Sequence, residues 1–93
     1  MPLRDTNADA PDDSTLALQA LVWTLAEPQR AIRLLDTTGL TPADLRASAS
    51  APATLIALLN FLEAHEPDLI ACADGIGTTP AALVRVRERM ETI

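Results

Sequence analysis

His65 and Cys72 are the residues best suited to nucleophilic chemistry, and each is the only one of its kind in the chain. A cysteine activated by a histidine base is a common covalent catalyst, and a separation of seven residues would place both on one face of a continuous helix. Pro67 lies between them, however, and proline interrupts a helix. Cys72 is also flanked by Ala71 and Ala73, which is typical of a small core residue. We therefore predict no catalytic residues and no enzymatic activity.

A metal or cofactor site lacks the residues that it would need. His65 followed by Glu66 matches half of a zinc-binding motif, but there is no second histidine and no second cysteine, so a closed zinc site cannot be assembled. The run Gly75-Ile76-Gly77 lacks the third glycine and the preceding strand of a nucleotide-binding loop, and it indicates a helix end instead. The sequence predicts no metal, no cofactor and no small-molecule substrate.

Glu63, Glu66 and Asp68 are the remaining candidates for acid–base chemistry, because they gather around Pro67. Carboxylates at the start of a helix interact favourably with its dipole and can cap its free amides. We therefore interpret this cluster as structural.

The basic residues are seven arginines without any lysine, and most of them lie in helical segments. Spacings of three and four residues place them in pairs on one helical face. Two interpretations stay open: solvated side chains in weak surface ion pairs with acids such as Glu88, or a surface for a partner or an anion. Under the second interpretation the candidate partner-binding residues are Arg30, Arg33, Arg85 and Arg89.

Composition indicates a small helical domain. The chain has 93 residues, of which 48% are hydrophobic, but only Trp23 and Phe61 are aromatic. Its core must therefore consist of Leu, Ile, Val and Ala, a mixture that favours helices. The net charge of -6 at pH 7 argues against nucleic acid as a partner, because phosphate binding needs a positive field.

The distribution of polar and apolar residues predicts a cytoplasmic protein. A single cysteine fits a reducing compartment, and the longest unbroken apolar runs, such as residues 55–59, are far shorter than the roughly 20 residues of a membrane span. Residues 1–11 are polar and acidic, without an apolar stretch, so we expect a disordered tail rather than a targeting signal. A single helical domain is expected over residues 12–93.

Apolar spacing, prolines and glycines together predict five or six short helices and no strand. The expected helices run from residues 12–14 to 26, from 28 to a stop at Gly39, over 43–49, 53–64 and 68–74, and from Thr79-Pro80 onward. The apolar side chains expected to point inward include Ile32, Leu34 and Leu35 in the second helix, with Leu69 and Ile70 in the fifth. Residues 53–64 are apolar around most of the helix, so this segment should be the central helix or an oligomer interface. The predicted fold class is all-α, a compact helical bundle.

An offset of 38 residues aligns the chain with itself. The segment around Trp23 then falls on that around Phe61, and the turn at residues 39–42 falls on that at 77–80. Either the chain contains two similar helical halves, or it uses common helix signals twice. In both cases the two apolar helices are expected to pack against each other, with the shorter helices at their flanks.

Four runs of residues resemble a family of short bacterial proteins known as domain of unknown function 3572. They are residues 18–23, 39–46, 58–62 and 69–73, and the resemblance extends over nearly everything after residue 11. It implies a bacterial, cytoplasmic, helical protein, and it brings no activity, substrate or catalytic residue.

Two functional hypotheses follow from the sequence. The first is a non-catalytic protein-interaction module that uses surplus apolar helix surface to hold another protein or a second copy of itself. The alternative is a DNA-associated regulator. A short helix, a Gly-Leu-Thr-Pro turn and a following helix occur in the same order as the elements of a helix-turn-helix motif.

Overall fold

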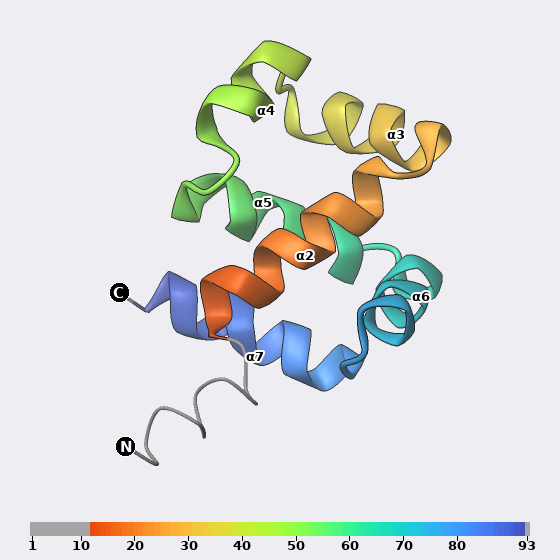
Figure 1. The fold of residues 1–93 in the computed structure, drawn as a ribbon, viewed down its shortest axis with the longest axis vertical. Coiled ribbons are helices and arrows are strands. Elements are labelled where there is room, and N and C mark those ends of the chain that lie inside the picture. The colour runs from red at the N-terminus through yellow and green to blue at the C-terminus, as the bar shows by residue number, and fades with distance from the viewer. Residues whose placement is uncertain (1–11, 93) are drawn as a thin grey trace, which may run out of the picture.

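Proline occupies one of the first two positions in five of the six helices in residues 12–92, the part of the chain described by the structure, a computed structural model. The helices are α2 (Asp13–Leu25), α3 (Pro28–Thr38), α4 (Pro42–Ser48), α5 (Pro52–Glu63), α6 (Glu66–Ile76) and α7 (Pro80–Glu91) (Figure 1). No strand occurs within residues 12–92, so the all-α prediction is confirmed. The tail predicted at residues 1–11 lies outside the described residues.

Side-chain caps and glycines set the remaining helix ends. The Asp12 carboxylate accepts a hydrogen bond from a backbone amide in the first turn of α2, and Thr41 forms a reciprocal capping box with Asp44 at α4. Gly39 and Gly77 end α3 and α6 with φ angles of 77° and 80°. Because this left-handed conformation is costly for residues with a Cβ, glycine is the residue that fits both helix stops.

The α6 helix is longer than the sequence suggested. It was expected over residues 68–74, but it extends from Glu66 to Ile76. Proline is well suited to the first turn of a helix, where its missing N–H has no helical partner, so Pro67 lies inside the start of α6. At the other end, Gly75 lies within the last turn of α6, and Gly77 ends the helix.

Helix α5 lies at the centre of the fold and packs against α2, α3, α6 and α7. The prediction of a central helix is therefore confirmed, as is the packing of the Trp23 helix on the Phe61 helix. The buried apolar side chains form one core cluster, which consists of Ala17, Ala20, Leu21, Leu34, Leu45, Leu55, Leu58, Leu59, Phe61, Leu62, Leu69, Cys72, Ala73, Leu83 and Val86.

Two residues that were expected to point inward are exposed. Ile32 is 52% exposed and Ile70 is 51% exposed. Residues two apart lie on nearly opposite sides of a helix, so Ile32 cannot share the inward face with Leu34, which is buried. The same geometry turns Ile70 away from Cys72, which is buried against the core.

The 38-residue offset relates the helices as well as the sequence. The bounds of α3, shifted by 38, are those of α6, and α4 and α7 begin 38 residues apart. The third helix differs between the halves: α4 ends at Ser48, whereas α7 continues to Glu91 and packs against α2, α5 and α6. Helix α4 stands at one end of the molecule and is the described helix with the least packing against the others (Figure 1).

Within residues 12–92, no single helix is both long and apolar enough to cross a membrane. Helices α6 and α7 pass such a test only as a pair, by length and composition, and they are bent by 99° at the break between them.

Candidate functional site

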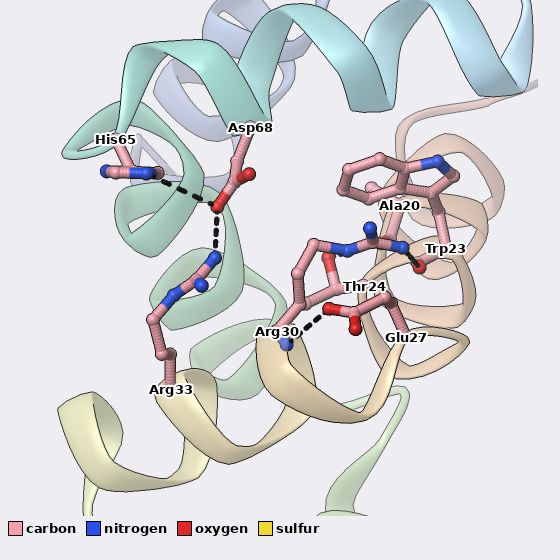
Figure 2. A network of polar contacts seen from close by, with 8 residues as sticks. All are labelled: Ala20, Trp23, Thr24, Glu27, Arg30, Arg33, His65 and Asp68. Carbon is pink, nitrogen blue, oxygen red and sulfur yellow. Dashed lines mark hydrogen bonds and ion pairs between the residues drawn. The ribbon is translucent and has the colours of Figure 1, made fainter.

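Arg30 lies against Trp23 instead of reaching into solvent. Figure 2 shows its guanidinium group over the indole ring, with its central carbon 3.7 Å from the ring centroid. One nitrogen of the group donates a hydrogen bond to the Trp23 carbonyl oxygen at 2.7 Å. The backbone N–H of Arg30 donates to the Glu27 carboxylate, which caps α3. The arginine therefore joins the start of α3 to the end of α2.

Arg33 connects α3 to α6. It donates a hydrogen bond to Asp68 at 2.7 Å, and His65 Nε2 lies 3.9 Å from the same carboxylate oxygen (Figure 2). Glu66 and Asp68 do lie in the first turn of α6, as the interpretation of these acids required, but no side chain caps that helix. Asp68 thus has a role that the sequence did not predict, as the partner of a cation 35 residues away.

The arginines of α7 also bind acids. Arg89 makes two hydrogen bonds of 2.8 Å to the Asp13 carboxylate at the start of α2. Arg87 pairs with Glu63 of α5 and, at 2.7 Å, with Glu91 of its own helix.

Three of the four predicted partner-binding residues make polar contacts within the fold. Arg30 and Arg33 make separate contacts from α3 to α2 and α6, while Arg89 binds the start of α2. Arg85 is exposed and makes no ion pair within residues 12–92. A partner surface built from these four arginines stays a prediction.

The first turn of α2 should make the fold sensitive to acid. Hydrogen bonding to the amide of Thr15 lowers the pKa of Asp12, and the hydrogen bond to Arg89 lowers that of Asp13, both from an ordinary value of 3.8. Carboxyl groups with a depressed pKa in the folded state stabilise it above their unfolded pKa, and this contribution is lost as the pH falls through the folded value. We expect the urea midpoint to fall as the pH drops below 3.8.

A matched control separates these two groups from the other carboxylates. A variant with Asp12→Asn and Asp13→Asn keeps a good helix cap but has no titrating group at either position. Its urea midpoint should depend less on pH over the same interval. An unchanged pH dependence in this variant would assign the effect to other acids.

His65 and Cys72 have opposite environments. The Cys72 side chain is fully buried in the core, and burial raises the pKa of its thiol to about 11. A thiol with such a pKa carries almost no thiolate at neutral pH, so it is a poor nucleophile. His65 is exposed at the start of α6. Within residues 12–92 no group of three or more His, Cys, Asp or Glu side chains is placed to hold a metal ion.

An open apolar groove lies along α2 and the end of α6. We call it the α2/α6 groove; its volume is about 550 Å³, and it is lined by Thr15, Leu18, Gln19, Val22, Trp23 and Ile76. Val22 is 63% exposed, the highest value among the large apolar residues of the described chain. Sequence reasoning missed this groove because α2 is rich in apolar residues on most sides. A signal was present in the offset of 38, which pairs Val22 with the polar Asn60 of α5.

Gly75 allows α6 to approach the edge of the Trp23 ring. A Cβ added at Gly75 would lie 2.7 Å from the indole Nε1 atom and 3.0 Å from Cδ1. Alanine would normally stabilise a helix by up to about 1 kcal/mol relative to glycine. Here the ring, which is covered by Arg30, must move, and overpacking costs about 1–3 kcal/mol.

We therefore expect Gly75→Ala to lower the free energy of unfolding by about 1 kcal/mol, measured by urea denaturation. Because Trp23 is the only tryptophan, its fluorescence should shift in the folded variant. A stabilised protein with unchanged fluorescence would show that the indole does not contact Gly75.

Comparisons with known proteins add a family and no activity. No curated protein and no solved structure matches the chain. The model of the family described as "Protein of unknown function (DUF3572)" matches residues 10–92, which is nearly the whole chain. The protein therefore belongs to the DUF3572 family.

Proposed function

We propose that this protein is a non-catalytic interaction module that associates with a second copy of itself through the α2/α6 groove. The observation that carries the proposal is the exposed position of Val22 in a groove lined almost entirely by apolar atoms. Contiguous apolar surface of this kind on a small soluble domain is typical of an interaction site, whereas single exposed apolar residues are common and carry no such meaning.

The uncharged lining of the groove is compatible with a second copy as the occupant. Each chain carries a net charge of -6, so two copies repel each other at long range and salt screens this repulsion; a contact surface without acidic groups adds no close like-charge pairs. The α2/α6 groove fulfils this condition, because none of its lining residues is charged. Association there buries apolar surface without desolvating a charge.

The spacing along α2 suits a two-fold interface. Leu18 and Val22 are four residues apart and therefore neighbours on one edge of the helix, and both are exposed. In an isologous contact, a residue that meets a second residue of the partner is matched by the reciprocal contact, because both copies use the same patch. A two-fold axis beside α2 would accordingly bring Val22 of one copy to Leu18 of the other.

The arrangement of the arginines supports a protein partner over nucleic acid. Arg33, Arg87 and Arg89 are each paired with a carboxylate, which removes much of the positive field that phosphates need. The exposed residues of α4, the second helix of the helix-turn-helix-like segment, include the acidic Asp44 as well as Arg46. A gel shift with genomic fragments at low salt tests the alternative, which predicts a retarded complex.

Sedimentation equilibrium over micromolar to millimolar concentrations tests the proposal. We expect a mass that rises with concentration from 9.9 kDa to twice this value. Val22→Asn installs the residue found at the corresponding position of α5 and should raise the dissociation constant at least about tenfold, because an amide would be buried in an apolar contact.

The control is Ile32→Asn, at another exposed apolar position on α3. This variant should self-associate like the wild type. A wild-type chain that stays monomeric at all concentrations, or equal effects of the two substitutions, would contradict the proposal.

A further inference from the structure

A second groove lies between α2, α3 and α4, on a different part of the molecule. We call it the α2/α3/α4 groove; its volume is about 340 Å³. Its lining includes Leu25, Ala31, Leu35, Leu45, Arg46 and Ala49, so that one guanidinium group accompanies an otherwise apolar surface. The size is at the lower end of the range for small-ligand pockets.

The other half of the chain shows why this groove is open. At the offset of 38, Ala31 corresponds to Leu69, which is buried in the core. The smaller alanine leaves space beside α3 that a leucine fills in the second half. Helix α4 also ends at Ser48, so that it lacks the length with which α7 covers the second half.

The mouth of the groove, between α2 and α4, also differs from the corresponding place in the second half. In the second half, Glu63 of α5 and Arg87 of α7 form an ion pair that ties the first helix of that half to the third. The corresponding residues in the first half are Leu25 and Ala49. They cannot pair, so no polar bridge closes the gap between α2 and α4.

A cation is nevertheless present at this mouth. Arg46 lies one helical turn before Ala49, is exposed, and makes no ion pair within residues 12–92. The second half holds a carboxylate and a guanidinium between its first and third helices, whereas the first half holds only the guanidinium. A ligand that supplies a carboxylate would complete the pair, and an apolar chain attached to it would fill the space beside Ala31.

We propose that the α2/α3/α4 groove binds an unbranched apolar monocarboxylate, a medium-chain fatty acid, with its carboxylate on Arg46 and its chain against Leu35 and Leu45. The apolar chain gains about 0.8 kcal/mol for each buried CH₂ group, which is about a fourfold gain in affinity. The charge-assisted hydrogen bonds to Arg46 set the orientation. This proposal is independent of self-association, which uses the other groove.

Calorimetric titration of the full chain with hexanoate, octanoate and decanoate, below the concentrations at which they form micelles, tests the proposal. We expect one site per chain and an affinity that rises about fourfold per CH₂ until the groove is filled. Arg46→Gln should weaken decanoate binding about tenfold. The matched control is Arg85→Gln, which removes another exposed arginine without an ion pair in the described chain and should bind like the wild type.

A second variant tests the groove itself. Ala31→Leu places the side chain of Leu69 at the corresponding position and should abolish binding by filling the space. Val22→Asn, which changes the α2/α6 groove, should leave decanoate binding unchanged. The proposal is overturned if the wild type shows no saturable binding, if affinity does not depend on chain length, or if Arg46→Gln binds like the wild type. Circular dichroism verifies that Ala31→Leu is folded, and if it is not, Arg46→Gln decides, since Arg46 is exposed.

Discussion

Replacing Leu59 by alanine is expected to lower the free energy of unfolding by about 3 kcal/mol. Leu59 is fully buried on the central helix α5, so the substitution removes apolar contacts and leaves a cavity that surrounding helices can only partly fill. Domains of this size have a total stability of only about 5–15 kcal/mol. Truncating this one side chain would thus remove a large part of the free energy of unfolding.

Urea denaturation followed by circular dichroism measures this effect. The control is Ile70→Ala, which removes an apolar side chain from an exposed position and should change the free energy of unfolding by less than about 0.5 kcal/mol. The apolar spacing of the sequence also predicts an inward position for Ile70. Equal losses in the two variants would therefore show that α6 has a different rotation from the one described.

Arg30→Ala should cost about 2 kcal/mol of stability, an unusually large effect for a half-buried arginine. The substitution removes the stacking of the guanidinium group on the Trp23 ring and the hydrogen bond to the Trp23 carbonyl oxygen. The side chain also covers apolar surface with its methylene groups. The loss of all three contacts should expose the indole, so the fluorescence of Trp23 should shift to longer wavelength.

Arg30→Lys distinguishes the contact from simple charge. A lysine keeps the charge but cannot lay a planar group over the ring while bonding to a carbonyl. We expect Arg30→Lys to recover less than half of the lost stability. Full recovery by lysine would mean that net charge alone explains the effect.

The local features of the fold could be predicted from the sequence. Asp12, Thr41 and the prolines start helices by interactions within a single turn, and Gly39 and Gly77 end them by their own backbone freedom. Such signals require no knowledge of distant residues. The burial of α5 could also be predicted, because a helix that is apolar on nearly all sides has few other places to lie.

Features that depend on helix crossing could not be predicted. Arg33 and Asp68 are 35 residues apart, and Arg89 and Asp13 are 76 apart, so their pairing follows only from how α2, α3, α6 and α7 meet. The neighbouring helices likewise decide which face of α3 points inward, so that Leu34 is buried and Ile32 is exposed. Both grooves arise from imperfect contact between helices, which the apolar spacing within a single helix does not reveal.

Helix α4 packs less against the other helices than any other described helix does, so it should open more readily than they do. This helix has seven residues and one buried anchor, Leu45, so little apolar burial offsets its ordering entropy. Its free energy of local opening should therefore be well below that of α5 or α7. We therefore expect the amide protons of α4 to exchange with solvent faster than those of α7, the longer third helix of the second half, which packs against α2, α5 and α6.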